Sequence, residues 1–158
     1  LLLACLSELS AATGLGIDIN PDVIATAAYN ADVLGLADRA SFAVADFTTS
    51  LEGLGYFDII LSNPPYIPSA QIAALSSEVV EHDPLLALDG GLDGLECWRK
   101  LMPEMARLLS AQGRVFVEIG DGQEQNVIAL AQAAGFSVNG VFADLSGKER
   151  CLVLSKRL

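Results

Sequence analysis

The sequence has few basic residues: 9 Lys and Arg stand against 20 Asp and Glu, which gives a formal net charge of −11. It also contains no long basic stretch. Proteins bind phosphate backbones mainly through Lys and Arg. The composition therefore argues against direct binding of a nucleic-acid substrate by this domain alone.

Long apolar runs are absent as well. No run approaches the roughly 20 residues that a membrane-spanning helix needs. The leucine-rich segment at residues 1–6 is short and has no basic flank, so we do not interpret it as a signal peptide. We expect no membrane partner and a cytoplasmic location.

Cysteine is scarce, and its spacing is typical of neither a disulfide framework nor a metal site. The three residues lie far apart in the chain, at Cys5, Cys97 and Cys151. We expect three buried, reduced thiols in a cytosolic protein, and no metal.

Apolar residues are plentiful, at 52% of the sequence with a mean hydropathy of +0.44, which fits a sheet buried on both faces. The 158 residues suit one domain with a sizeable core. No linker, repeat or low-complexity segment divides them.

Helical and strand patterns alternate along the chain. We expect helices at residues 1–10, 21–34, 95–109 and 123–134, and strands at 15–19, 40–45, 57–62, 114–119, 136–142 and 150–154. Asn20 and Pro21 are typical of a helix start, whereas Pro103 predicts a kink or a break.

This alternation predicts an α/β fold with a doubly wound, mainly parallel sheet. The last two strands have no helix between them and are expected to form an antiparallel C-terminal hairpin. In such open sheets, ligands bind at the carboxyl ends of the strands. Four polar residues fall at those ends and predict a site there: Asp18, Asp46, Asn63 and Glu118.

The segment Asn63-Pro64-Pro65-Tyr66 directly follows the apolar strand expected at residues 57–62. A rigid loop that carries an amide and an aromatic ring is suited to binding a planar nitrogen group. It indicates methyl transfer to an amino or amide nitrogen. The alternative is a proline-rich turn that merely ends a strand.

Several segments together resemble the class I S-adenosylmethionine-dependent methyltransferases, which are Rossmann-like. The chain is more closely similar to the HemK/PrmC family, the glutamine N5-methyltransferases of peptide-chain release factors. The asparagine-proline-proline-tyrosine loop alone is shared by several amino-directed methyltransferases, and the 82–95 segment adds specificity. The supporting segments are Gly16-Ile17-Asp18-Ile19, residues 62–68, residues 82–95, Val117-Glu118-Ile119-Gly120 and Lys148-Glu149-Arg150.

The resemblance implies S-adenosyl-L-methionine as methyl donor and S-adenosyl-L-homocysteine as product. It implies that Asp18, beside Ile19, accepts hydrogen bonds from the ribose hydroxyls. Asp46 would face the adenine amino group and Phe47 would cover the ring, with Asn63 also near the cofactor. The alternatives are a helix-capping acid at Asp18, and a turn acid with a core phenylalanine at 46–47.

The resemblance also implies a protein substrate, a release factor glutamine held by Asn63, Pro64, Pro65 and Tyr66. The Asn63 side-chain carbonyl and the Pro64 backbone carbonyl would each accept one N–H bond from its amide. The prolines fix φ beforehand, and Tyr66 would cover the amide plane. The alternatives are a ribosomal-protein glutamine, exocyclic amines of RNA or DNA, and a degenerate, non-enzymatic module that binds a partner.

Residues 67–95 are expected to form a flap over the substrate, with Gly90, Gly91 and Gly94 allowing unusual backbone angles. His82 is the single histidine, and we assign it to loop packing rather than to base catalysis. Glu118 could hold the substrate or the flap, or be a structural acid. Glu149 and Arg150 are expected to pair at a hairpin end.

The sequence departs from the family pattern at its start. The family places a first strand and a glycine-rich loop just before the helix expected near Leu1, and we therefore expect an N-terminally incomplete catalytic domain. Such a polypeptide would be poorly stable, with exposed sheet edges, and would not bind S-adenosylmethionine. Calorimetric binding at micromolar affinity would contradict this expectation.

Overall fold

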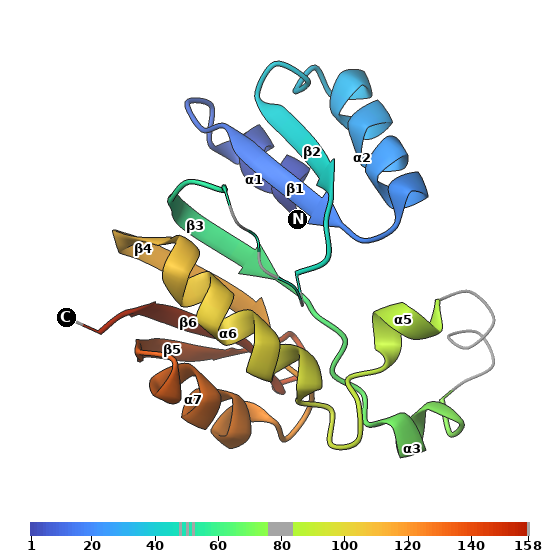
Figure 1. Ribbon diagram of the computed structural model, residues 1–158, viewed down its shortest axis with the longest axis vertical. Helices are drawn as coiled ribbons and strands as arrows, with labels where there is room; N and C mark the ends of the chain where they lie inside the picture. The colour runs from blue at the N-terminus through green and yellow to red at the C-terminus, as the bar shows by residue number, and fades with distance from the viewer. Residues whose placement is uncertain (48, 50, 52, 76–83, 158) are drawn as a thin grey trace. The chain divides into compact units, whose positions relative to one another are not determined.

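The computed structural model describes residues 1–47, 49, 51, 53–75 and 84–157 (Figure 1). Their contacts divide the chain into two compact units, Leu1–Glu52 and Gly53–Leu158. The expectation that all residues form one domain stays a prediction, and each unit is described by itself.

The first unit is a parallel pair of strands with two helices. Its elements are α1 (Leu2–Glu8), β1 (Gly14–Asp18), α2 (Pro21–Val33) and β2 (Ala40–Val44). In the β1–β2 pair, Gly14 lies opposite Ala40 and Asp18 lies opposite Val44. The carboxyl ends of both strands therefore meet at one edge of this sheet.

The boundaries of α2 follow from local chemistry. Asn20 caps its start, where the side-chain oxygen accepts a hydrogen bond from the Asp22 N–H at 2.9 Å, and Pro21 takes the first helical position. Gly35 follows its end with φ of +67°, a conformation that glycine adopts without strain. The predicted boundaries of this helix are confirmed.

Arg39 fastens α1 to the rest of the first unit. Its guanidinium donates hydrogen bonds to the backbone carbonyls of Leu6, Leu9 and Ala12 at 2.8, 3.0 and 2.9 Å. The last carbonyls of a helix have no partner within the helix, and a cation there also complements the helix dipole.

The second unit is a mixed sheet with the strand order β3-β4-β6-β5. Its elements are β3 (Phe57–Ser62), α3 (Ser69–Ile72), α5 (Leu85–Leu88), α6 (Glu96–Leu108), β4 (Leu109–Glu118), α7 (Glu124–Ala133), β5 (Phe136–Ala143) and β6 (Glu149–Lys156). β3 and β4 are parallel, whereas β6 runs antiparallel to both of its neighbours. The α/β class and the C-terminal hairpin are thus confirmed.

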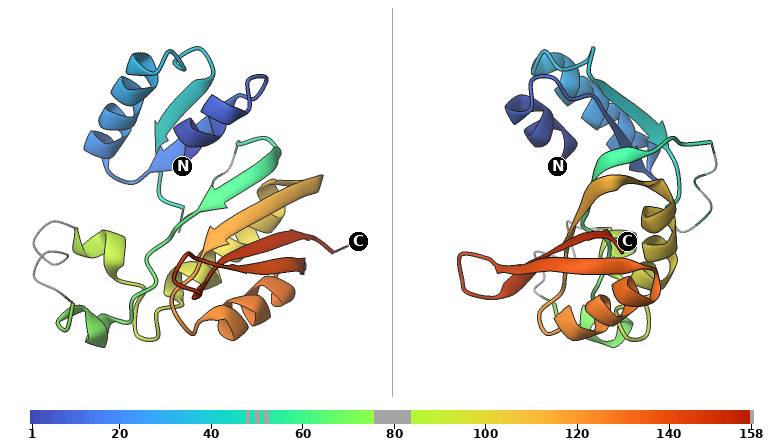
Figure 2. Two further views of the ribbon diagram at one scale, coloured as in Figure 1. Left: turned by 180° about the vertical axis from the view of Figure 1, so that it is seen from behind. Right: turned by 90° about the vertical axis from the view of Figure 1, so that its left-hand side faces the viewer.

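Helices α6 and α7 lie on the same face of this sheet, as Figures 1 and 2 show. The buried residues of α6 recur at helical spacing, which places one side of the helix in the core: Trp98, Leu101, Met102, Met105 and Leu108. Strand β4 contributes Val115 and Val117, at most 1% exposed. Trp98 is fully buried and belongs to this core.

Two expectations for this unit need correction. Helix α6 runs through Pro103 without the expected break, and the alternative, a kink there, stays a prediction. Pro103 is exposed, so the carbonyl that loses its N–H partner can be hydrated. Strand β4 begins at Leu109, five residues before the expected start at residue 114. Leu109 is fully buried and pairs with Phe57, so tertiary packing extends the strand.

Cys5, Cys97 and Cys151 form no disulfide with one another. Each is half-buried rather than fully buried. Burial, with the charge of Glu118 as the second cause, raises the pKa of the Cys151 thiol.

Candidate functional site

Polar residues lie at the carboxyl ends of the strands in both units. In the first unit, Asp18 is the last residue of β1, and Asp46 lies two residues beyond β2. In the second unit, Asn63 follows β3, and Glu118 ends β4. Because Ser62 pairs with Val117 in parallel register, Asn63 and Glu118 leave the same edge of their sheet.

Asp18 is half-buried and holds the turn into α2. Its Oδ1 accepts a hydrogen bond from the Asn20 N–H at 2.8 Å, and its backbone carbonyl accepts one from the Ala45 N–H at 2.9 Å. A carboxylate has about four acceptor positions, so this turn contact leaves capacity for a ligand diol. The structural role and the ligand role are compatible.

The residues beside these two acids offer apolar surface. Ile19 is 47% exposed, and Phe47 is half-buried. The Asp46 backbone carbonyl accepts hydrogen bonds from the N–H and the hydroxyl of Thr49, at 3.1 and 2.8 Å, which fixes the turn after β2. The edge of the first unit thus combines carboxylate acceptors with an aliphatic and an aromatic side chain.

The Asn63–Tyr66 loop begins with an exposed Asn63 and continues through a buried Pro64. Pro65 and Tyr66 are half-buried. The two prolines have fixed φ and no N–H donors. The loop therefore presents a side-chain amide and backbone carbonyls from a stiff backbone.

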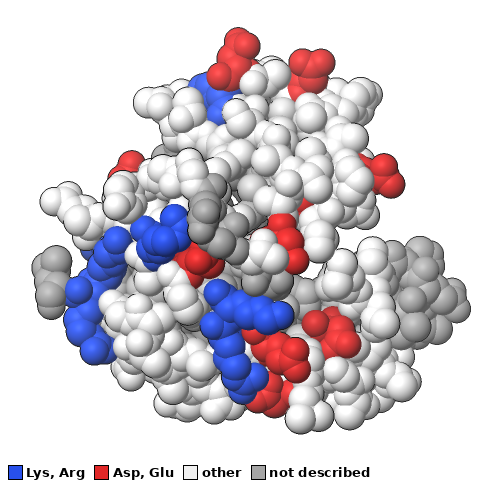
Figure 3. Space-filling view, viewed as in Figure 1, with Lys and Arg blue, Asp and Glu red and all other residues white. Residues whose placement is uncertain are grey.

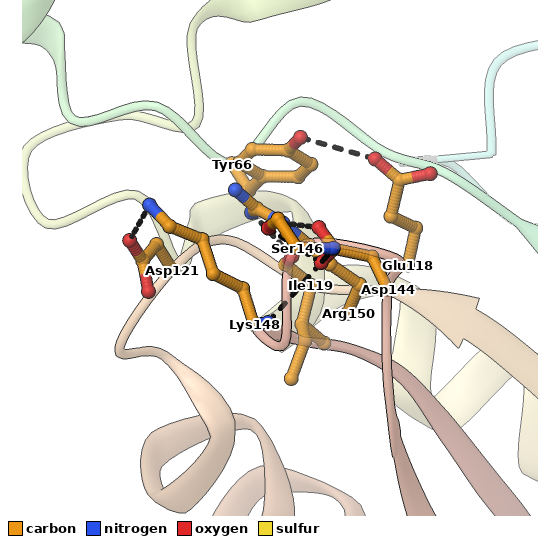
Figure 4. A network of polar contacts seen from close by, with 8 residues as sticks. All are labelled: Tyr66, Glu118, Ile119, Asp121, Asp144, Ser146, Lys148 and Arg150. Atoms are coloured by element: carbon orange, nitrogen blue, oxygen red, sulfur yellow. Dashed lines mark hydrogen bonds and ion pairs between the residues drawn. The ribbon is translucent and has the colours of Figure 1, made fainter.

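Tyr66 is fixed by Glu118, as Figure 4 shows: its hydroxyl donates a hydrogen bond of 3.1 Å to Glu118 Oε1. Burial, followed by the charge and hydrogen bond of Glu118, raises the pKa of Tyr66 above its usual value, while Arg150 opposes this. The hydroxyl therefore stays protonated at neutral pH and remains a donor. This contact places Glu118 beside the Asn63–Tyr66 loop, and its role there stays a prediction.

The Tyr66 backbone is fixed by Gln123, which the sequence patterns did not single out. The Gln123 Nε2 donates to the Tyr66 carbonyl at 2.9 Å and to the Gly94 carbonyl at 3.3 Å. Its Oε1 accepts from the Gly120 N–H at 3.1 Å. From sequence, Gln123 indicated only the start of α7, and no short-range signal pointed to these contacts.

The segment that follows α5 lies against this loop. The Ile67 N–H donates to the Leu88 carbonyl at 3.0 Å, and the Ile67 carbonyl accepts from the Gly90 N–H at 2.8 Å. Asp89 adds two hydrogen bonds to this contact. Its Oδ1 accepts one from the Ser69 hydroxyl at 2.7 Å and one from the Gly91 N–H at 2.9 Å. These two bonds lower the pKa of Asp89, the Ser69 bond being the larger cause.

The glycines of this segment are needed for two different reasons. Gly91 and Gly94 have φ of +85° and +75°, the unusual backbone angles expected of them, whereas Gly90 has no positive φ, so that expectation was wrong for Gly90. Gly90 is needed for space, since a Cβ there would lie 2.8 Å from the Cα atoms of both Tyr66 and Gly94. The flap itself stays a prediction; residues 76–83, including His82, lie outside the described part of the chain.

Arg150 supports the end of β4 (Figure 4). Its Nη1 donates to the Ile119 carbonyl at 3.1 Å, and its Nε lies 3.6 Å from Asp144 Oδ2. Lys148 pairs with Asp121 at 2.5 Å. The expected Glu149–Arg150 pair was wrong, because adjacent strand residues point to opposite faces and Arg150 faces Asp144 instead.

Charges are mixed on the face drawn in Figure 3, where Lys and Arg side chains form separate groups next to Asp and Glu. Among the described residues, no three His, Cys, Asp or Glu side chains cluster in a way that could hold a metal ion. Within the same residues, no helix has the length and apolar character needed to cross a membrane.

Comparisons with known proteins identify the family and the fold of the chain. A family model described as a methyltransferase domain matches residues 2–152. A release factor glutamine methyltransferase of Rhodospirillum rubrum is 48% identical over 99% of this chain and 48% of its own length. A protein of the same name from Bradyrhizobium diazoefficiens is 46% identical over 99% of this chain and 52% of its own length.

The chain thus spans about half the length of these curated relatives. Among solved structures, a ribosomal protein L11 methylase from Lactobacillus delbrueckii subsp. bulgaricus matches with a TM-score of 0.70 and 17% identity, over 99% of this chain and 64% of that one. This likeness concerns the fold alone. On the family match and the fold, the chain belongs to the methyltransferase domain family.

Proposed function

We propose that this chain carries the methyl-transfer site of a release factor glutamine methyltransferase, which methylates the side-chain amide nitrogen of a glutamine in a peptide-chain release factor. The observation that carries the proposal is the stiff loop after β3. It presents an exposed Asn63 beside a Tyr66 held by Glu118 at 3.1 Å. The names of relatives 46–48% identical over 99% of the chain support the substrate.

The residues of the first unit fit the adenosine part of S-adenosyl-L-methionine. Asp18 and Asp46 offer carboxylate acceptors, for the ribose hydroxyls and the adenine amino group respectively. Ile19 and Phe47 offer apolar surface for the ring. When bound, this cofactor supplies the methyl group, and S-adenosyl-L-homocysteine remains as product.

The amide nitrogen of glutamine is a weak nucleophile, because its lone pair is delocalised into the carbonyl. The Asn63 side-chain carbonyl and the Pro64 backbone carbonyl would each accept one of its N–H bonds and so orient the nitrogen. Acceptors aimed at these protons also stabilise positive charge as it develops on the nitrogen. The methylated nitrogen still carries both of its protons, so one of them becomes acidic and is lost to solvent after the transfer.

Tyr66 would cover the amide plane and exclude water from it. Its ring is half-buried, and its hydroxyl is occupied by Glu118, so the ring is held rather than free to rotate away. A protein glutamine is the favoured substrate over a nucleic-acid amine because the formal net charge is −11. Since release factors act in translation, the proposal places the reaction in the cytoplasm.

The test is a methyl-transfer assay with a chimera, in which the aligned 157 residues of the Rhodospirillum rubrum relative are replaced by this chain. The chimera is incubated with methyl-labelled S-adenosylmethionine and, separately, with a release factor, ribosomal proteins and RNA. We expect label on one glutamine of the release factor. Label on ribosomal protein or RNA alone, or no label at all, would overturn the proposal.

A further inference from the structure

We propose that Gln123 is a positioning residue that holds the Asn63–Tyr66 loop in place through the Tyr66 carbonyl. Its importance for turnover rests on the proposed function. Gln123 occupies the N-cap position of α7, yet its side chain makes no capping bond to that helix. The side chain is directed instead to the loop after β3 and to the glycine segment before α6, which comprises residues 90–94.

The amide of Gln123 has a partner for each of its polar atoms. Nε2 uses two protons on the carbonyls of Tyr66 and Gly94, and Oε1 accepts the Gly120 N–H. A backbone carbonyl can only accept and an N–H can only donate, so the partners fix which way the amide points. Among the other common side chains, only Asn carries the same planar amide, with two donors and one acceptor, and the Asn side chain is shorter.

The prolines limit how the loop backbone can be anchored. Pro64 and Pro65 have no N–H to donate, so their backbone can form hydrogen bonds only through carbonyls. The Tyr66 carbonyl is the acceptor that Gln123 uses, one residue before Ile67 joins the Leu88–Gly90 segment. Gln123 therefore links the Asn63–Tyr66 loop, which is proposed to bind the substrate amide, to the segment that supports this loop.

Close packing leaves the Gln123 amide little room to move. A Cβ at Gly94 would lie 2.6 Å from Nε2 and one at Gly120 would lie 2.6 Å from Oε1, both closer than atoms can approach. Gly90 and Gly94 are buried. Shifting the amide would thus disturb three segments together, and Gln123 adds to the anchors that Glu118 and the Ile67 backbone give the loop.

The discriminating variant is Gln123→Glu, with Gln125→Glu as its matched control. Both add one carboxylate at the start of α7, but Gln125 is exposed. An ionised glutamate at 123 can accept from Gly120 and cannot donate to Tyr66 or Gly94. In the chimera, we expect Gln123→Glu to lower kcat roughly 10- to 100-fold, the scale of a slightly misplaced reacting group, with a smaller change in KM; Gln125→Glu should match the parent.

A pH profile separates positioning from general damage. A protonated glutamate can donate to the Tyr66 carbonyl again, so the ratio of variant to parent kcat should rise as pH falls toward the usual glutamate pKa of about 4.3. Gln123→Ala cannot donate at any pH, so its ratio should stay low. A Gln123→Glu ratio that is flat with pH, or a kcat equal to that of the parent, would overturn the proposal.

Hydrogen exchange tests the same role without activity. In the chimera, the Ile67 and Gly90 amides, which bond to Leu88 and Ile67, should exchange faster in Gln123→Glu than in Gln125→Glu. Equal exchange would overturn the positioning role, even if the chimera methylates its substrate. If the parent chimera transfers no methyl group, the proposed function fails, and the exchange rates still decide the role of Gln123.

Discussion

Asn63 is the residue on which the proposed chemistry most directly depends. It is exposed at the end of β3 and contributes nothing to the core, so its replacement should leave the fold intact. We expect Asn63→Ala in the chimera to lower turnover roughly 10²-fold or more, the scale of one lost transition-state hydrogen bond. Near-normal methylation by this variant would refute the role.

A matched control exists on β5. Asn139 is also exposed on a strand, and Asn139→Ala removes the same atoms away from the loop. Its turnover should equal that of the parent. Equal losses in the two variants would show that the effect of Asn63→Ala is not local.

Tyr66 should keep its proton into alkaline solution. Burial and Glu118 raise its pKa above 10.0, so the folded state binds this proton more tightly than the unfolded state does. The corresponding stability is fully present below about pH 10 and is lost as the pH rises through the folded pKa. A titration of the Tyr66 ring by NMR, with the signal identified by its loss in Tyr66→Phe, measures this directly.

Replacing Glu118 separates the two causes of the raised Tyr66 pKa, which are burial and the Glu118 carboxylate. In Glu118→Gln, the carboxylate charge is removed while most of the burial remains. The Tyr66 midpoint should therefore move down toward 10.0 but stay above it, because burial is the largest cause. A midpoint at or below 10.0 in the unmodified chain would contradict the contact between the two side chains.

Single residues were predictable where local chemistry decides them. The Asn20 cap, the strand-end positions of Asp18 and Asn63, and the left-handed Gly91 and Gly94 agree with the structure. Gln123 was missed because its partners at residues 66 and 94 lie 57 and 29 positions away. No periodicity carries information about such a contact.

The glycine segment before α6 can be tested by comparing two glycines with the same backbone conformation. Gly94 has φ of +75° and Gly122 has φ of +74°. A Cβ at Gly94 would lie 2.4 Å from the Tyr66 carbonyl oxygen, whereas nothing lies within 4 Å at Gly122. The two substitutions by alanine thus share backbone strain and differ in steric clash.

We expect Gly122→Ala to lower the free energy of unfolding by about 1–2 kcal/mol, the usual cost of a left-handed non-glycine residue. Gly94→Ala should cost about 1–3 kcal/mol more, since overpacking adds to the strain. Urea unfolding of this chain measures both. Equal costs would mean that residues 66 and 94 do not touch in solution.

The start of α6 depends on Asp93. Its carboxylate accepts hydrogen bonds from Arg99 Nη1 at 3.0 Å and from the Leu95 N–H at 3.1 Å. The Arg99 bonds, first among the causes, lower the pKa of Asp93 from 3.8 to about 2. The corresponding stability is present above pH 3.8 and is lost as the pH falls through about 2.

An NMR titration of the Asp93 carboxyl carbon should therefore give a midpoint near 2. In Arg99→Ala the midpoint should move back toward 3.8, because the largest cause is removed. Lys100→Ala, next in sequence and also exposed, serves as the control and should leave it unchanged. Identical midpoints in all three proteins would contradict the Asp93–Arg99 pair.

Elements were predictable where the apolar pattern and the end signals agree. β3 has the expected bounds, and α2 and α7 end within one residue of expectation. The start of β4 was placed five residues too late, directly after Gly113. In the structure Gly113 is buried, and a Cβ there would lie 2.7 Å from Leu109 Cδ1, so close packing rather than a turn explains this glycine.

Charge is the property that acts over the whole molecule. The excess of 20 acidic over 9 basic residues gives −11, and the Lys and Arg groups on the face in Figure 3 lie among acids. A phosphate backbone is repelled by such a field at long range. Under the proposed function, the charge of this chain thus favours a protein substrate over RNA before either one contacts the Asn63–Tyr66 loop.

We therefore expect this chain to bind a fluorescent mixed-sequence RNA with a Kd weaker than about 10⁻⁴ M at physiological salt, at the weak limit of ordinary non-specific binding. Fluorescence anisotropy measures this, with a basic RNA-binding protein of similar size as positive control. Binding at micromolar Kd that weakens steeply with added salt would reveal a phosphate-binding surface. Such a result would remove the electrostatic reason for preferring a release factor glutamine over a nucleic-acid amine, and the decision would then rest on the identity of the methylated product.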